Sequence, residues 1–339
     1  MNPAKYYNTV KYSPYNTNPR IFIAALLTSI MLLAGCPAWN NYVQQHAGLP
    51  PVAFAGRPTL ETIMATVNTS QSIQQLQTQN AKVSIPGAPS LKANVVIDRP
   101  RNFRLTASLF DFTRTEVDFG SNQELAWLWI REQPEPAVYF VRHDQLASTA
   151  AKYYMPIDLN WITEAMGLVY IDPAEHHEGP FDLGQGKYEI RSRIQSPMGD
   201  LNRRLIIDDR FGWVLEQHLT LDNGKSLASV KASKHSFYPQ HGVSLPHRIK
   251  IQLFPGQQNQ IAFQIDVPRY QINSNMGNAS QLWTMPKYDG YEQIDLSTMP
   301  APQTSYYYPL DQVQPAPGNI PRYQTQIASP RFRGDNFNR

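Results

Sequence analysis

The hydrophobic and polar positions of this chain alternate with a period of two over most of residues 81–273. This alternation is typical of β-strands that pack one face on a core and leave the other face in water. Short turns, and few regular helical segments, separate the alternating stretches, so we expect about ten or eleven strands in an antiparallel sheet. The clearest stretches are residues 91–98, 103–109, 201–208, 213–221, 249–253 and 261–267.

Two stretches carry helical spacing instead. The first, residues 59–80, begins at Thr59, a capping residue, and a second cap at Asn68 predicts a shorter, more polar helical continuation. The second, residues 158–168, places its apolar residues on one side of a helix. Residues 172–186 hold glycines, two prolines and a run of charged and histidine side chains, which predicts an irregular loop. The fold class is therefore mainly β with a few helices.

An apolar run lies close to the amino end, at residues 21–36. Its uninterrupted part, about 13 residues, is shorter than the roughly 20 that a membrane-spanning helix needs and suits an export signal. The run ends in Leu33-Ala34-Gly35-Cys36. An ordinary amino-terminal anchor, or a cleaved signal with an incidental cysteine, is the alternative.

Leu33-Ala34-Gly35-Cys36 resembles the lipobox of bacterial lipoproteins. The resemblance implies a diacylglyceryl thioether on Cys36, cleavage before it and acylation of the new amino end. Two or more acyl chains hold a protein stably on a membrane, whereas one chain is marginal. Cys36 is the only cysteine of the chain, so no intramolecular disulfide can form. Pro37 is not the aspartate that retains some lipoproteins at the inner membrane, which favours the periplasmic side of the outer membrane.

The charge of the chain changes once the predicted signal is removed. Residues 1–35 contain three basic residues and no acidic residue, so a formal net charge of +3 falls to zero in the mature chain. A neutral chain lacks the basic face that nucleic acid needs, and we expect no nucleic-acid partner.

Proline content marks the boundaries of the domains. We predict a lipoprotein signal peptide at 1–35, a flexible tether at 36–57, a folded domain at 58–296 and a Pro-rich disordered tail at 297–339, which carries seven prolines. The tail can also be interpreted as an arm that binds an envelope protein.

Three segments resemble the LolA/LolB superfamily of periplasmic lipoprotein-handling proteins. They are Arg99-Pro100-Arg101-Asn102-Phe103-Arg104-Leu105, Glu116-Val117-Asp118-Phe119-Gly120-Ser121-Asn122 and Trp127-Leu128-Trp129-Ile130, the last two being similar to segments of uncharacterised planctomycete lipoproteins. The resemblance implies an incomplete antiparallel β-barrel, or half-barrel, with a helical lid and a concave apolar face that accepts acyl chains. This chain is longer than usual members of that superfamily, and the apolar loop that such receptors use at the membrane has no evident counterpart.

The expected ligand is therefore an acyl chain or a lipoprotein, bound without bond chemistry. Eleven apolar residues are candidates to line the cavity: Phe103, Leu105, Leu109, Trp127, Trp129, Ile249, Ile251, Leu253, Ile261, Phe263 and Ile265. Trp127 and Trp129 share one strand face with Leu125, and they can line the cavity or fill a core, which is the usual role of large aromatic side chains. The alternative function is a structural envelope lipoprotein with a filled core and a partner-binding tail.

Motifs for catalysis are missing from the sequence. There is no Gly-x-Ser-x-Gly elbow, phosphate loop or dinucleotide fingerprint. His176 and His177 are neighbours without a metal-binding spacing. We therefore expect no catalytic residue, no metal and no cofactor.

Overall fold

The computed structural model describes residues 49–109, 114–131, 137–155, 159–196, 199–257, 260–274 and 279–301. The chain divides into two units, residues 1–47 and residues 48–339, and the elements described below belong to the second. Its elements, in chain order, are α3 (Leu60–Val67), η1 (Asn68–Ser72), β1 (Gln75–Ser84), β2 (Leu91–Asp98), β3 (Asn102–Ser108), β4 (Thr115–Ser121), β5 (Leu125–Ile130), β6 (Ala137–Arg142), α4 (His143–Leu146), α5 (Ala151–Tyr154), α6 (Leu159–Ala165), β7 (His176–Gly184), β8 (Lys187–Ser196), β9 (Gly199–Asp208), β10 (Val214–Leu221), β11 (Ser226–Tyr238), β12 (Val243–Leu253), β13 (Ile261–Asp266), β14 (Gln271–Ile272), α7 (Ala279–Leu282), β15 (Glu292–Asp295) and η2 (Leu296–Thr298).

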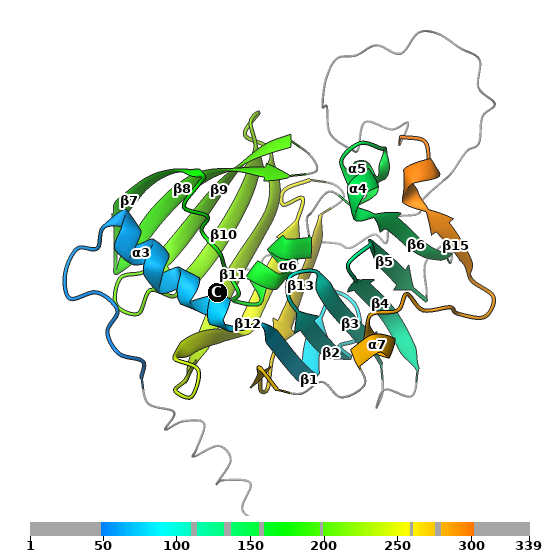
Figure 1. Ribbon diagram of the computed structural model, residues 1–339, viewed down its shortest axis with the longest axis horizontal. Helices are drawn as coiled ribbons and strands as arrows, with labels where there is room; N and C mark the ends of the chain where they lie inside the picture. Colours follow the sequence, from blue (N-terminus) through cyan, green and yellow to red (C-terminus); the bar gives the residue numbers. More distant parts are fainter. Residues whose placement is uncertain are drawn as a thin grey trace, which may run out of the picture. The chain divides into compact units, whose positions relative to one another are not determined.

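The described strands form one open sheet (Figure 1) in the order β15-β6-β5-β4-β3-β2-β1-β13-β12-β11-β10-β9-β8-β7, with β14 paired to β1. Neighbours are antiparallel except β15 and β6, which are parallel. The long-range pairing of β1 with β13 joins the two runs of sequential strands. The prediction of a mainly β, antiparallel and unclosed sheet is confirmed.

The prediction of helices at residues 59–80 agrees with the structure only in part. The Thr59 side chain accepts a hydrogen bond from the Thr62 backbone N–H and caps α3, as predicted. The helical continuation to residue 80 is wrong, because after one short 3-10 turn the chain enters β1. Leu76 and Thr78 of β1 are buried, and β1 pairs with β2, β13 and β14. This long-range pairing outweighs the weak local helix propensity of the segment.

The prediction of an irregular loop at residues 172–186 is wrong. They contain β7, the edge strand, which pairs with β8 through backbone hydrogen bonds with two breaks in register. Its side chains are mostly exposed, so no apolar alternation marks it in the sequence. The second predicted helix is found as α6, inside residues 158–168.

We call the face of the sheet that carries Ile249 and Ile265 the inner face. Figure 1 looks on to it and shows α3 and α6 in front of the strands. One buried cluster joins β1–β3 and β9–β13 to Trp161, Ala165 and Met166 of α6 and its end. A second cluster packs Ile63 and Val67 of α3 on strands β8 and β9. The opposite side is the outer face.

The predicted domain boundaries can be compared with the described residues only in part. Phe54 lies inside the predicted tether, yet it is buried against the α3 cluster. Leu296 is buried, and η2 extends beyond it to Thr298. The packed unit therefore extends past both predicted boundaries by a few residues. Cys36, the predicted signal and residues 302–339 lie outside the described residues.

Candidate functional site

The inner face carries apolar side chains that the core buries only in part, and the first group of them lies on β12 and β13. Ile251 is opposite Phe263 and Leu253 is opposite Ile261 in the β12–β13 pair, so all four share this face. Ile251 is buried and Ile261 is half exposed, at 50%. Other apolar side chains of the inner face are partly buried against the core at several levels of the sheet: Leu91, Leu105, Val117, Phe119, Leu253 and Phe263.

The structure brings most of the predicted cavity residues to this face. Ile249 and Ile265 are buried beneath the cluster that includes α6. Phe103 is buried as well, with its ring 5.3 Å from that of Phe119 in an edge arrangement. Leu109 follows β3 and is half-buried. The remaining inner-face candidates are the partly exposed Leu105, Leu253, Ile261 and Phe263.

Trp127 and Trp129 are not part of this surface. In the β4–β5 pair Leu128 is opposite Phe119, an inner-face residue, so the two tryptophans point to the outer face. Both are completely buried there, and the ring of Trp129 stacks on that of Tyr288 at 3.8 Å. A single cavity lined by all eleven candidates therefore does not exist, and the tryptophans fill a separate core.

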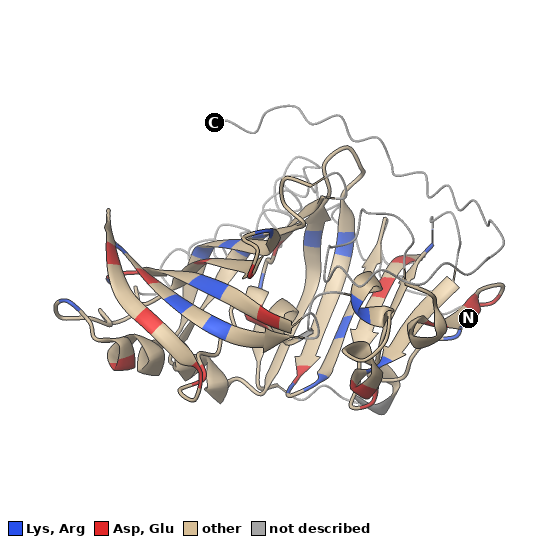
Figure 2. Cartoon of the chain, turned by 90° about the horizontal axis from the view of Figure 1, so that it is seen from above, with Lys and Arg blue, Asp and Glu red and all other residues tan. Residues whose placement is uncertain are grey.

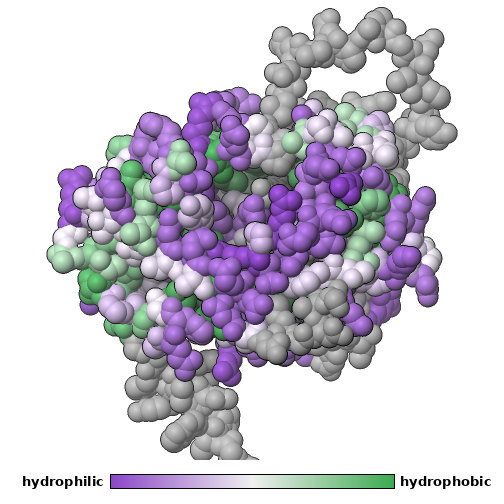
Figure 3. Space-filling view, in the orientation of Figure 1, coloured by the Kyte–Doolittle hydropathy of each residue, from purple (hydrophilic) through white to green (hydrophobic). Residues whose placement is uncertain are grey.

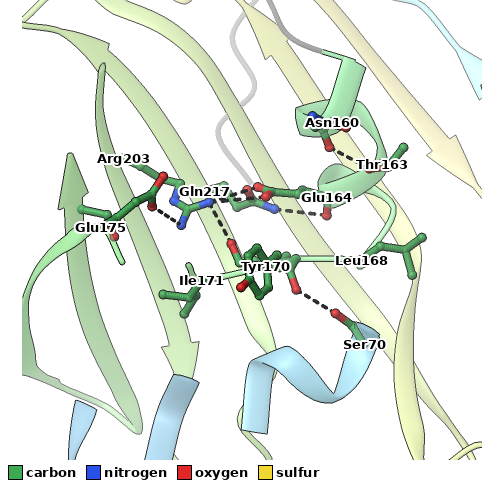
Figure 4. A network of polar contacts seen from close by, with 12 residues as sticks. Ser70, Asn160, Thr163, Glu164, Leu168, Tyr170, Ile171, Glu175, Arg203 and Gln217 are labelled. Atoms are coloured by element: carbon green, nitrogen blue, oxygen red, sulfur yellow. Dashed lines mark hydrogen bonds and ion pairs between the residues drawn. The ribbon is translucent and has the colours of Figure 1, made fainter. Parts of the chain in front are cut away.

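Helix α6 is held on the inner face by a buried arginine. The Arg203 side chain is 4% exposed, and its guanidinium donates to the two carboxylate oxygens of Glu164 at 3.4 and 3.3 Å. Arg203 also donates to the Tyr170 carbonyl oxygen at 3.1 Å, and Gln217 donates to the Glu164 carbonyl oxygen. Figure 4 shows Arg203 between Glu164 and Glu175, with Gln217 beside it. These contacts connect α6, the strap at residues 168–171 and the strands below.

The strap is also hydrogen-bonded from its other side. The Asn68 side chain donates to the Ile171 carbonyl and accepts from the Ile171 N–H, each at 2.9 Å. The Ser70 hydroxyl donates to the Val169 carbonyl, and Arg99 donates to the Leu168 carbonyl. Every one of these bonds joins segments far apart in sequence, so α6 and the strap are fixed as one cover over the inner face.

Burial and ion pairing act in opposite directions on Glu175, the second carboxylate beside Arg203. Burial raises the pKa of Glu175, and the attraction of Arg203, 3.7 Å from its carboxylate, opposes this rise. The His177 Nε2 donates to the Asp172 carbonyl oxygen, and the His177 Nδ1 forms a hydrogen bond with the Ser192 hydroxyl, both at 2.7 Å. Removing charges from water costs free energy that such contacts only partly return, so this network specifies position more than it adds stability.

The sequence contains a signal for the buried position of Arg203. Leu201, Arg203 and Leu205 occupy successive positions on one strand face, and the flanking two are buried leucines. A charged residue in phase with inward-facing apolar residues requires a buried partner. That partner, Glu164, lies on a different element, so the alternation reveals the need for an ion pair and not its other half.

The surface over the inner face is mixed. Figure 3, in the orientation of Figure 1, shows hydrophilic side chains across the middle and hydrophobic patches beside them. Among the described residues, no group of three or more His, Cys, Asp or Glu side chains could hold a metal ion. Within the same residues, no helix is both long enough and apolar enough to cross a membrane.

Comparison with known proteins gives only distant structural likenesses. No protein-family model matches the chain, and no curated protein matches it. A domain from Vibrio parahaemolyticus described as an outer membrane lipoprotein-sorting protein aligns with a TM-score of 0.44 and 9% identity, covering 66% of this chain and 98% of its own. A LolA superfamily protein from Nitrosomonas europaea aligns at 0.42 and 10%, covering 68% and 99%. A DUF1329 family protein from Desulfovibrio piger aligns at 0.42 and 8%, covering 64% and 93%. Neither a family nor an activity follows from likenesses of this size.

Proposed function

We propose that this protein is a bacterial envelope lipoprotein, anchored through Cys36, that binds an acyl chain or the acyl group of a lipoprotein on the inner face of its sheet. The observation that carries the proposal is the set of apolar inner-face side chains that the core buries only in part, among them Leu105, Phe119, Phe263 and the half-exposed Ile261. Ligand pockets are lined predominantly by apolar side chains. Lipid anchoring and placement at the outer membrane are part of the proposal and rest on residues 21–37.

The energetics of such binding are favourable. Burying about ten methylene groups supplies roughly 8 kcal/mol before the costs of ordering the chain and the protein are subtracted. Apolar contact distinguishes chain length poorly, so we expect weak selectivity between lipids. No bond is made or broken in this function, and we propose that the protein is not an enzyme.

The test of ligand binding uses residues 48–339, which form one compact unit. A fluorescent fatty-acid probe is titrated into the protein, and a lipopeptide is added as competitor. We expect saturable, competable binding that is lost in Phe263→Glu. Ala262→Glu is the matched control, because Ala262 is opposite Gln252 on the outer face of the same strand and should retain binding.

The outcome separates this function from the alternative. Helix α6 already covers much of the inner face with Trp161, Ala165 and Met166, and this coverage favours a structural lipoprotein with a filled core. A folded parent protein without saturable binding, or equal binding by both variants, would replace the acyl-binding proposal with that structural role.

Lipid anchoring has its own test. The intact mass of the membrane-extracted protein should correspond to a chain that starts at Cys36 and carries a diacylglyceryl thioether and an amino-terminal acyl group. A mature chain that starts elsewhere, or an unmodified thiol at Cys36, contradicts the anchor without affecting the acyl-binding test.

A further inference from the structure

The outer face carries a polar cavity that the proposed function does not use. Its volume is about 470 Å³, within the roughly 300–1,000 Å³ of small-molecule sites. Figure 2 shows basic and acidic positions concentrated on the strands at the left of the view, which are those at the β7 end of the sheet in Figure 1. The cavity is lined by residues of β7–β10. Eight of them have outer-face side chains: His176, Glu178, Arg191, Arg193, Asn202, Arg204, His218 and Thr220. Ser192 and Arg203, whose side chains point to the inner face, complete the lining.

The strand register places two arginines side by side. Arg191 of β8 is directly opposite Arg204 of β9, and His218 of β10 follows in the same row. Like charges in directly opposed positions destabilise a sheet. The pair therefore needs a reason other than strand pairing.

A buried carboxylate binds both arginines, each through its own Nε nitrogen. Glu189, whose side chain is 4% exposed, accepts from the Arg191 Nε through one oxygen and from the Arg204 Nε through the other, each at 2.6 Å. Burial raises the pKa of Glu189, but the two guanidinium hydrogen bonds outweigh it and the pKa is lowered overall. The carboxylate is thus ionised and keeps both guanidiniums in place.

This arrangement leaves the ends of both guanidiniums unused. Within the part of the chain that the structure describes, no hydrogen bond or ion pair joins an Nη nitrogen of Arg191 or Arg204 to another residue. The Arg191 guanidinium also lies over the Phe181 ring at 4.7 Å, which restricts its motion. Two oriented forks with free donors match the geometry of a phosphate group.

The other charged side chains of the cavity are already paired. Arg193 binds Asp200 and Asp222, each at 3.0 Å, so it lines the cavity but its donors are already engaged. Glu178 is directly opposite Arg191 in the β7–β8 pair, and its carboxylate lies 4.0 Å from the His176 ring. Glu189 and Glu178 together balance the formal charge of Arg191 and Arg204, so what this pair offers a ligand is its unused Nη donors.

We propose that this cavity binds a phosphomonoester, with its phosphate on the Nη groups of Arg191 and Arg204. The cavity is larger than a phosphate ion, and Asn202 and Thr220 are also among its lining residues. The Asn202 amide donates to Asp222 and the Thr220 hydroxyl donates to the Asn202 carbonyl, so the oxygens of both side chains remain as acceptors. Amide and hydroxyl groups suit a hydroxyl-bearing substituent, such as a sugar or a lipid headgroup. The site is on the opposite face from the acyl-binding surface and does not depend on it.

Isothermal titration calorimetry on residues 48–339 tests the proposal. The probes are glucose 6-phosphate, glucose and inorganic phosphate, together with phosphatidylcholine vesicles with and without phosphatidic acid. Saturable binding of glucose 6-phosphate but not glucose supports a soluble phosphomonoester. Binding only to vesicles that contain phosphatidic acid supports a lipid headgroup. If neither glucose 6-phosphate nor the vesicles that contain phosphatidic acid bind, the proposal is wrong.

Variants locate the binding. Arg191→Gln and Arg204→Gln should each weaken binding at least tenfold, and Arg204→Lys should weaken it less, because lysine keeps the charge and loses the fork. Arg248→Gln is the matched control, since Arg248 also binds a carboxylate through Nε at 2.6 Å, on Asp266, outside the cavity. Thermal melts check folding, and Arg191→Gln remains decisive if an Arg204 variant does not fold. An equal loss of binding in Arg248→Gln would mean that the overall charge of the protein explains the effect, and the proposed site would be wrong.

Discussion

Two of the buried carboxylates on the outer face of the sheet, Asp118 and Glu189, have different surroundings. Asp118 is completely buried and accepts from three side chains, those of Arg104, Trp127 and Tyr288. Glu189 is nearly as buried but accepts only from two half-exposed arginines. Both organise guanidinium groups, and only one leaves those groups with free donors.

The difference comes from what lies over each carboxylate. Residues 279–295 extend over Asp118, where Tyr288 donates to its carboxylate at 2.7 Å and Arg104 donates to the Leu282 carbonyl at 3.0 Å. The region around Glu189 opens into the polar cavity. A covering segment that supplies the remaining donors and acceptors makes such a cluster a structural latch, and without one the same chemistry is a binding site.

The largest expected effect is the loss of the closed cluster. Asp118→Asn leaves Arg104 without its charged partner and weakens the bonds of Trp127 and Tyr288, so we expect a loss of about 3–5 kcal/mol in the free energy of unfolding. Urea denaturation measures it. Asp266→Asn is the control, because its ion pair with Arg248 is partly exposed and should cost about 1 kcal/mol or less. Equal losses would contradict the latch.

Gly120 tests the packing that closes this cluster. It is opposite Trp127 across the strands, and a Cβ atom at position 120 would lie 2.2 Å from the Trp127 ring. Gly120→Ala must displace the ring, so we expect a loss of about 1–3 kcal/mol and a changed tryptophan fluorescence spectrum. Gly56→Ala, where a Cβ meets no neighbouring atom within 4 Å, should be close to neutral. A fluorescence spectrum unchanged by Gly120→Ala would mean that the ring is not tightly packed.

The open cluster should matter less for stability. Glu189→Gln removes a buried charge whose two partners are about half exposed and can reach water, so we expect a loss of about 1 kcal/mol. The same urea denaturation, run beside Asp118→Asn, gives the comparison directly. A loss as large as that of Asp118→Asn would make Glu189 a second latch and weaken the assignment of the cavity as a binding site.

The two clusters should also differ at opposite ends of the pH scale. The pKa of Glu189 is lowered in the folded protein, so its contribution is present above the usual pKa of 4.5 and is lost as the pH falls below that. Burial and the nearby Asp118 raise the pKa of Tyr288, so its contribution is present below pH 10 and is lost above that. Melting temperatures across the pH scale should show a shallower acid decline in Glu189→Gln and a shallower alkaline decline in Tyr288→Phe. Parallel profiles for the parent and both variants would contradict this assignment.

The sequence by itself determined the sheet and a good part of the inner face. Alternation with a period of two requires strands with two chemically distinct faces, because successive side chains point in opposite directions. This local rule correctly grouped Ile249, Ile251 and Leu253 with their partners on β13. The cap at Thr59 was equally local, since its hydrogen bond reaches only to Thr62.

Only the tertiary structure decided which face of each strand meets which part of the chain. Alternation put Trp127 and Trp129 on one face, but β5 carries apolar side chains on both faces, so the pattern could not distinguish inner from outer. The cover of the outer face, Tyr288, is 170 residues from Asp118, and the partner of Arg203 is 39 residues away. Edge strand β7 and strand β1 also depend on distant partners. Local pattern fixes how a side chain is directed relative to its neighbours, whereas long-range pairing and covering segments fix what it touches.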